Sequence, residues 1–371
     1  MNKIEYQELI AFHPGYYIKD YLDDFGITQE ELAKRLEDTP NYISDLVNGR
    51  INLTDEMVLK LATAFGTSTK LWLNLNQTYI EKKLEIEKRI RIDEECSLLK
   101  KIDYKFFVDL GLVKSTRKAT EKVTELQRFF KISSLNVLCK RDFLVQYRTS
   151  VSDVKDINVI NANAWVQTAI NLGMQIEVQP FNKKKLINSI PEIRNMTIQD
   201  PEVFYPRLKG ILADCGVALV LLPNLKNCGV NGAVKWLGKE KVILAINDRR
   251  KYADIFWFAL FHELGHVLQQ RIKILFISEN NKDELRIDER IQKEEVDADV
   301  FSQNTLIPKE EYDQFIELCD DNFTKELIEW FAKRINILPG IVVGRLQHDG
   351  RLSNNTTLNS IKTKYIIGNS N

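Results

Sequence analysis

The chain has 371 residues, enough for two or three domains of ordinary size. Its 52 basic and 52 acidic side chains cancel, and 44% hydrophobic with 28% charged residues is a globular composition. These values exclude a polybasic coat, an acidic tail and a disordered or collagen-like chain. No apolar run has the length of a signal peptide or a membrane span, so we expect a cytoplasmic protein with no membrane partner. The five cysteines form no C-x-x-C pair, which indicates reduced thiols.

Residues 14–80 carry apolar positions at helical spacing, separated by polar turns. Thr28 precedes QEELAKRL with Glu31 three positions later, the pattern of a capping box. Thr39 precedes Pro40 at the start of a second short helix, and Asn48-Gly49 is a helix stop. Two short helices joined by a tight turn form a helix-turn-helix, which we predict for this segment.

The layout of residues 13–79 resembles the Xre-type helix-turn-helix, and more closely its HigA-like antitoxin branch. The order of the short helix, the second helix, the NGR turn, the DEMVLKLA helix and the Trp72–Gln77 ending carries this resemblance. It implies operator DNA as a partner, a toxin as a second partner, and a homodimer formed through this domain. It also implies that the second helix enters the major groove. Asn41, Tyr42, Ser44 and Asp45 would then lie near base edges, and Gln29, Asn48 and Arg50 near phosphates.

The charge of this first segment leaves an alternative open. Residues 1–80 contain seven basic and twelve acidic side chains. DNA affinity depends mainly on the neutralisation of phosphates by cations, so this net charge of −5 is unfavourable. A dimerisation or protein-docking module, for example one that binds a toxin, is therefore the second hypothesis for the same fold.

Beyond the first segment we expect a mainly α protein that ends in an α+β domain. Mixed charges over 81–105 indicate a solvated helix, and we place a boundary near residue 85. Residues 86–200 are predicted to be a helical middle region without recognisable chemistry. After Pro206 the runs VALVLLP, AVKWLG and KVILAIN predict a small sheet, and the apolar run around 252–270 predicts a buried helix. The expected domains are 1–85, 86–200 and 201–371.

The buried helix contains His262-Glu263-Leu264-Gly265-His266. Histidines at i and i+4 lie on one helix face, where both can bind one Zn²⁺, and Glu263 can reach a water on that ion. A catalytic zinc site needs a third protein ligand. Glu295 is our candidate, because it shares a helix face with Asp299, which can accept a hydrogen bond from a ligating histidine.

Two alternatives to this assignment remain. Asp297 and Glu294 compete with Glu295 for the third ligand position, although both project from other faces of the helix. The cluster as a whole could also be a buried polar group whose members hydrogen-bond to one another and bind no metal. A buried group of ionisable residues is costly unless it is paired or bound to a metal, which favours the metal reading.

The second half of the chain, roughly residues 205–350, resembles the ImmA/IrrE family of metallopeptidases. The resemblance rests on the strand pair, the AIND run, the HELGH motif and the residues that flank this motif. The chain departs from the family pattern at Asp297, where the family usually has glutamate. The flanking residues are Arg250, Phe258, Leu260, Glu295, Ala298, Asp299, Phe301, Leu306 and Pro308. It implies a zincin-like fold and cleavage of a repressor or antitoxin protein in a stress, phage or mobile-element circuit.

These residues define an expected mechanism of zinc-assisted peptide hydrolysis. Glu263 acts as the general base, and His348 is the histidine left to stabilise an oxyanion in this part of the chain. His348 has an equally simple reading as a surface or capping residue. The rival functions are an antitoxin-type transcriptional regulator whose metal domain is structural or sensory, and a module that docks a toxin.

Overall fold

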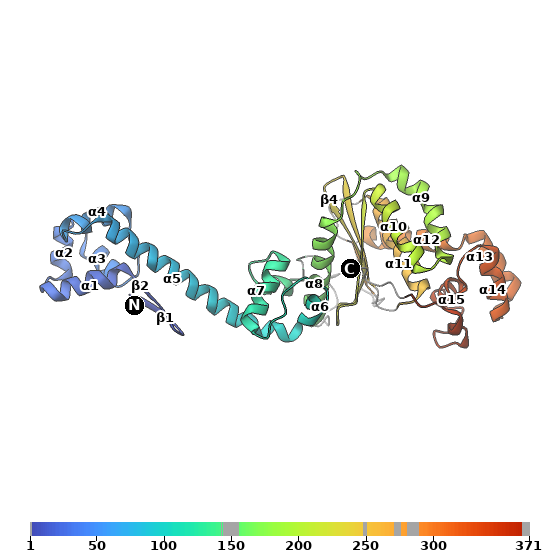
Figure 1. The fold of residues 1–371 in the computed structure, drawn as a ribbon, viewed down its shortest axis with the longest axis horizontal. Coiled ribbons are helices and arrows are strands. Elements are labelled where there is room, and N and C mark those ends of the chain that lie inside the picture. Colours follow the sequence, from blue (N-terminus) through green and yellow to red (C-terminus); the bar gives the residue numbers. More distant parts are fainter. Residues whose placement is uncertain are drawn as a thin grey trace. The chain divides into compact units, whose positions relative to one another are not determined.

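The computed structural model describes residues 2–141, 143, 156–247, 251–270, 276–279 and 289–365. The chain divides into two compact units, residues 1–97 with 116–124 and residues 98–115 with 125–371, and each is described by itself. Helices dominate the described residues, and the sheets are small (Figure 1). None of the described helices is both long enough and apolar enough to cross a membrane.

The first unit consists of a β-hairpin followed by helices. Its main elements are β1 (Lys3–Tyr6), β2 (Leu9–Phe12), α1 (Pro14–Phe25), α2 (Gln29–Arg35), α3 (Pro40–Val47), α4 (Asp55–Ala64) and α5 (Thr69–Glu95). The antiparallel hairpin packs on α5, where Leu9 and Ala11 contact Tyr79 and Ile86. The helices enclose a separate core that includes Ile18, Ile43, Leu61 and Trp72.

The helix ends of this unit follow the predicted capping pattern. The Thr28 hydroxyl accepts from the Glu31 amide, and the Thr39 hydroxyl accepts from the Tyr42 amide, which confirms both predicted N-caps. α3 ends at Val47, and Gly49 has a φ of 68°, as the predicted stop requires. The second half of the capping box is wrong: the Glu31 carboxylate pairs with Arg35 across one helical turn instead of turning back to Thr28.

Gly15 fixes the approach of α1 to α3. A Cβ at this position would lie 2.2 Å from the Leu46 carbonyl oxygen and 2.7 Å from that of Val47. Only glycine therefore allows the start of α1 to contact the end of α3 this closely. The predicted pair of short helices, α2 and α3, is held in this way against the rest of the bundle.

The rest of the chain alternates helices with a small sheet. Its elements are η1 (Cys96–Lys101), α6 (Tyr104–Asp109), α7 (Ala119–Phe130), η2 (Leu135–Cys139), α8 (Asp156–Gln175), α9 (Lys183–Asn195), η3 (Met196–Ile198), α10 (Pro201–Asp214), β3 (Val217–Leu222), β4 (Val230–Leu237), β5 (Lys241–Asn247), α11 (Ala253–Gln269), β6 (Phe276–Glu279), α12 (Glu289–Leu306), α13 (Lys309–Cys319), α14 (Lys325–Arg334), α15 (Pro339–His348) and η4 (Thr357–Ile361).

The sheet has the strand order β3-β5-β4-β6, with β3 parallel to β5 and the other pairs antiparallel. The predicted runs form β3, β4 and β5, and β6 adds a fourth strand. Ile243 contacts Gly173 of α8, whereas Gly232 contacts Glu263 of α11. Because Lys235 pairs with Ile243 and Gly232 with Ile246, these contacts lie on opposite faces of the pleated sheet. α8 and α11 therefore cover opposite faces, as Figure 1 shows.

Two helices depart from the expected domain organisation. Residue 85 lies within α5, which continues to Glu95. α8, expected in a separate middle region, packs on the sheet and is buried over most of its surface, including Trp165. A helix that is buried on most of its surface needs partners on several sides, and the sheet provides one of them.

The last described residues pack against the start of α11. Lys362 Nζ lies 2.6 Å from Asp254 Oδ2, and both side chains are buried, at 11% and 3% exposure. Lys364 bridges to Tyr252 in antiparallel fashion, and the Trp257 indole donates to the Tyr365 hydroxyl at 2.8 Å. Residues 362–365 thus pack against the first turns of the helix that carries the HELGH motif and help to hold it in place.

Candidate functional site

α11 positions the two histidines of the HELGH motif inside the second unit. This helix is apolar on most of its surface and is buried between the sheet and α12. Gly265 lies against α12, where an added Cβ would be 3.0 Å from Ala298 Cα. The close helix contact that glycine permits brings the residues of α12 next to the motif.

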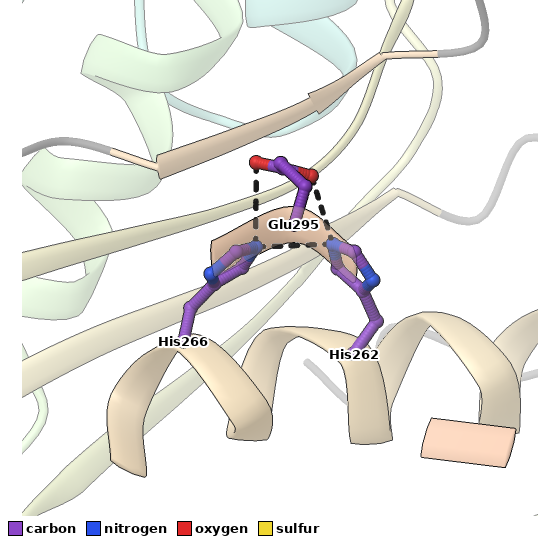
Figure 2. A group of neighbouring side chains, drawn as sticks. All are labelled: His262, His266 and Glu295. Carbon is purple, nitrogen blue, oxygen red and sulfur yellow. Dashed lines mark hydrogen bonds and ion pairs between the residues drawn. The ribbon is translucent and has the colours of Figure 1, made fainter. Parts of the chain in front are cut away.

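The structure brings His262, His266 and Glu295 together. The two Nε2 atoms are 3.1 Å apart, and the Glu295 carboxylate lies 3.5 Å from His262 Nε2 and 3.6 Å from His266 Nε2. Figure 2 shows both rings of α11 directed at the carboxylate of α12. This is the group of three residues predicted as metal ligands.

The spacing of the two imidazole nitrogens is close to that of tetrahedral zinc ligands. Two ligand atoms at the usual Zn²⁺ distances lie about 3.3–3.4 Å from each other when the angle between them is tetrahedral. The two Nε2 atoms are 3.1 Å apart, and the distances of 3.5 and 3.6 Å to Glu295 run to its two different carboxylate oxygens. One ligand atom from each of the three residues lies within 4.8 Å of the others. Two imidazoles and one carboxylate are also the donor set of a catalytic zinc site, which leaves a fourth position for water.

The outer nitrogens of both histidines are held by hydrogen bonds. His262 Nδ1 lies 2.8 Å from Asp299 Oδ1, and His266 Nδ1 lies 3.0 Å from Gln269 Oε1. The Gln269 amide in turn donates to the Glu294 main-chain carbonyl of α12 at 2.7 Å. An Nδ1–H that donates to an oxygen leaves the Nε2 lone pair available for a metal. Sequence reasoning assigned this role to Asp299 and missed Gln269, although it lies three residues after His266.

Glu263 is fully buried beside this group, and neither of its carboxylate oxygens has a hydrogen-bond partner among the described residues. Its side chain packs on Gly232 of β4, where a Cβ would lie 2.3 Å from Oε1. A buried carboxylate without a partner is costly, and a cation bound at the neighbouring group would offset this cost. Sequence reasoning missed Gly232, because only the register of β4 against α11 reveals it.

The environment raises the pKa values of His262 and Glu263 and lowers that of His266. Burial lowers the pKa of His262, but hydrogen bonds to Asp299 and Glu295 and the charge of Glu263 outweigh it and raise this pKa to about 10. Burial lowers the pKa of His266 to about 4, and the charge of His262 adds to this effect. Burial raises the pKa of Glu263 to about 8, aided by Glu295 and opposed by His262. A cation bound here would therefore replace the proton on His262.

The competing carboxylates lie elsewhere on α12. Asp297 is exposed, and Glu294 is buried on a different face from Glu295. His348, at the end of α15, is 46% exposed and contacts Asp349 and, at 3.3 Å, Gln303. Its charge is one of the influences that lower the pKa of Asp299, yet the structure does not group it with the three potential ligands. The oxyanion role for His348 stays a prediction.

The residues expected to contact DNA lie on or next to α2 and α3. They are Gln29, Asn41, Tyr42, Ser44, Asp45, Asn48 and Arg50, none of them buried. Arg50 pairs with Asp45 at 3.1 Å, and the Asn48 amide donates to the Ser44 carbonyl at 2.7 Å. Asn41 is exposed. These contacts hold the end of α3 and leave its first turn accessible for contacts with a duplex.

The helix-turn-helix family profile matches residues 18–72 of this chain. An uncharacterised HTH-type transcriptional regulator of Escherichia coli, YddM, is 36% identical over 66 residues, which are 18% of this chain and 70% of that protein. Virulence-associated protein I of Dichelobacter nodosus is 32% identical over 83 residues, 22% of this chain and 77% of that protein. Antitoxin HigA-1 of Vibrio cholerae is 38% identical over 56 residues, 15% of this chain and 52% of that protein. The chain belongs to the helix-turn-helix family through this first segment.

Proposed function

We propose that the chain is a DNA-binding transcriptional regulator whose second unit is a zinc-dependent peptidase. The observation that carries the peptidase part is the convergence of His262, His266 and Glu295 beside the buried carboxylate of Glu263, which has no hydrogen-bond partner in the described part of the chain. A structural zinc site needs four protein ligands and no spare carboxylate. Three ligands and one unused base form the arrangement of a hydrolase.

Each residue has a distinct task in this proposal. His262, His266 and Glu295 would hold Zn²⁺, which when bound makes a water acidic and polarises a carbonyl group. Asp299 and Gln269 orient the two imidazoles. Glu263 accepts a proton from the attacking water and passes it to the leaving amine nitrogen.

The substrate follows from the resemblance to the ImmA/IrrE family. We expect a repressor or antitoxin protein, cleaved between residues of its own chain, and the helix-turn-helix would bring the peptidase to operator DNA or to that repressor. The relatives YddM and HigA-1 are named a transcriptional regulator and an antitoxin, which supports DNA and a toxin as partners of the first unit.

A second candidate is an antitoxin-type regulator in which the metal domain is structural or sensory. The names of the relatives favour it, since none of the three reported above is named as a peptidase. The two candidates differ in one respect that is open to measurement. A sensory domain would bind zinc without turnover, whereas a peptidase would lose turnover when Glu263 is changed and keep its metal.

The decisive experiment compares wild type with Glu263→Gln. Both proteins are incubated with purified helix-turn-helix repressors and antitoxins encoded near this gene, with and without a chelator, and bound zinc is measured in parallel. We expect about one zinc per chain in both proteins. Hydrolysis should fall by roughly 10²- to 10⁴-fold in the variant, the usual contribution of a general base.

Glu202→Gln is the matched control, because Glu202 is an exposed glutamate of α10. It should cleave like wild type. Cleavage that continues in Glu263→Gln would contradict the assigned base. Zinc binding without cleavage of any of these proteins would favour the sensory candidate.

A further inference from the structure

One short segment of the chain carries a large excess of basic over acidic residues. Residues 98–141, here called the basic segment, contain eleven basic and four acidic side chains, a net charge of +7. Residues 1–97 carry a net charge of −6, and residues 142–371 one of −1. The neutrality of the whole chain therefore hides a strongly positive segment directly after an acidic helix-turn-helix domain.

Most of these cations are available to solvent. Lys100, Lys105, Lys131 and Lys140 are exposed and have no ion pair among the described residues. In contrast, Arg128 is paired with Glu125 at 2.7 Å, and Lys101 lies 3.9 Å from Asp156. Four lysines without a carboxylate partner are surplus positive charge that a polyanion can neutralise.

The fold holds the two ends of the basic segment at the same helix. Buried amides of α8 donate to main-chain carbonyls of this segment: Asn161 to Lys101 at 2.8 Å, and Asn163 to Leu138 and Lys140, both at 2.9 Å. Asn161 and Asn163 are two residues apart. The main chain beside Lys100 and that of Lys140 are thus both anchored to α8, although they are 40 positions apart in sequence, and they approach this helix from different sides.

A third amide and an aromatic cluster hold the centre of the segment. Asn171 donates to the Phe129 carbonyl at 2.6 Å, and the Phe107 ring contacts those of Phe129 and Phe130. Buried amides that donate to main-chain carbonyls fix the path of a backbone. The lysines are therefore carried by a backbone of defined path and not by a disordered tail, which is the property that a positioning contact to nucleic acid needs.

We infer that the exposed lysines of the basic segment, Lys100, Lys105, Lys131 and Lys140, bind the phosphates of duplex DNA and supply the affinity that the acidic helix-turn-helix domain lacks. This inference rests on the proposed DNA binding. Phosphate contacts provide most of the affinity of a DNA-binding protein and carry no sequence information. In this division of tasks α3 reads bases and the basic segment neutralises phosphates.

The test measures the salt dependence of DNA binding by the full-length protein. The probe is a labelled duplex of about 30 base pairs and mixed sequence, titrated from about 50 to 200 mM KCl. In the variant Lys100→Gln/Lys105→Gln/Lys131→Gln/Lys140→Gln the slope of log K against log salt should fall by about 3 to 4, because each lost phosphate contact removes about 0.9. Affinity at about 100 mM salt should fall roughly 10²- to 10³-fold.

A matched control removes the same charge from elsewhere in the second unit. Lys183, Lys184, Lys226 and Lys239 are exposed and lie outside the basic segment. Their replacement by glutamine should change the slope by less than about 1. An equal decrease of the slope in both variants would show that DNA binding depends on the net charge of the protein and not on the lysines of the basic segment. This result would overturn the inference. Tighter binding of an RNA hairpin than of the duplex would also overturn it.

A third variant separates this inference from the proposed function. Asn41→Ala/Ser44→Ala should lose the preference for the DNA upstream of the gene over the mixed duplex, while the salt slope stays. If this preference is lost as expected and the lysine variant keeps the wild-type slope, the inference is wrong and operator reading by α3 stands. If wild type binds neither duplex even at low salt, both are wrong.

Discussion

The helix-turn-helix of the first unit and the group of potential metal ligands in the second are assembled in different ways. The residues of α2 and α3 come from one short stretch, and the contacts that shape it, such as Thr28 to Glu31, connect positions three residues apart. The potential metal ligands join α11 to α12, with Gly232 of β4 against Glu263. A site built from neighbours in sequence tolerates changes elsewhere, whereas one built from three elements depends on the packing between them.

The largest effect should come from the ligand that α12 contributes. Glu295→Ala removes one of three potential ligands, so zinc affinity should fall by orders of magnitude. Asp297→Asn, an exposed carboxylate of the same helix, is the matched control and should leave zinc affinity nearly unchanged. Competition against a chromogenic chelator measures both. A severe loss in Asp297→Asn instead would contradict the geometry of α12.

The partner of a ligating histidine should have an intermediate effect. Asp299→Asn keeps the shape of the side chain but weakens the hydrogen bond to His262 Nδ1. Partners of this kind contribute roughly 10- to 100-fold to metal affinity or activity. The same chelator competition, repeated with Gln269→Ala for His266, tests whether both imidazoles need their outer hydrogen bond. Wild-type affinity in both variants would show that these bonds do not orient the rings.

The contact between the sheet and α11 can be tested by adding one methyl group. In Gly232→Ala the new Cβ would meet the buried Glu263 carboxylate, and overpacking of this kind costs about 1–3 kcal/mol of unfolding free energy. Gly210→Ala is the control, since its Cβ would meet nothing within 4 Å inside α10. It should stabilise the protein by about 0.5–1 kcal/mol. Chemical denaturation followed by tryptophan fluorescence compares the two variants.

The smallest effect concerns pH and the first unit. His13 caps α1 by accepting from the Gly15 amide with Nδ1, and burial lowers its pKa below the ordinary value of 6.5. The unfolded chain therefore binds this proton more readily. The stabilisation is present above pH 6.5 and is lost as the pH falls through the lower folded pKa. Protonation also removes the lone pair that accepts from Gly15.

Amide exchange of α1 in the full chain provides the measurement. Wild type is compared at pH 7 and pH 5 with His13→Asn, which keeps a capping oxygen and has no proton to gain. Protection of α1 should decrease at pH 5 in wild type by more than in the variant. An equal decrease in both proteins would mean that His13 does not couple the helix to pH.

The sequence predicts more of the helix-turn-helix than of the candidate metal site, because the first is built from neighbours in sequence and the second from separate elements. Thr28, Thr39 and Gly49 act on residues within three or four positions, and simple rules identify them. The pairing of His262 with His266, and of Glu295 with Asp299, follows from helical spacing alone. Gly232 could not be found in this way, because its role depends on how β4 packs against α11. Gln269 lies one helical turn after His266, so the same spacing rule could have found it.

Long-range packing, which local patterns do not reveal, also explains why the observed organisation of residues 86–200 differs from the expected one. Residues 86–200 were expected to be a separate helical region, since their apolar positions indicate helices but not partners. In the structure Gly173 of α8 fits against Ile243, and that contact joins α8 to the sheet. A local pattern reveals that a helix is buried, and only long-range packing reveals what buries it.

The ion pair between Asp254 and Lys362 has a consequence for the timing of folding. Asp254 is in the first turn of α11, and its only cationic partner among the described residues comes more than 100 positions later. A buried carboxylate deprived of its partner costs about 3–5 kcal/mol. On the ribosome, α11 therefore stays under-stabilised until Lys362 has emerged. The helix that carries the HELGH motif reaches its full stability only after Lys362 has been made, so a nascent chain that stops before this residue holds its site incomplete.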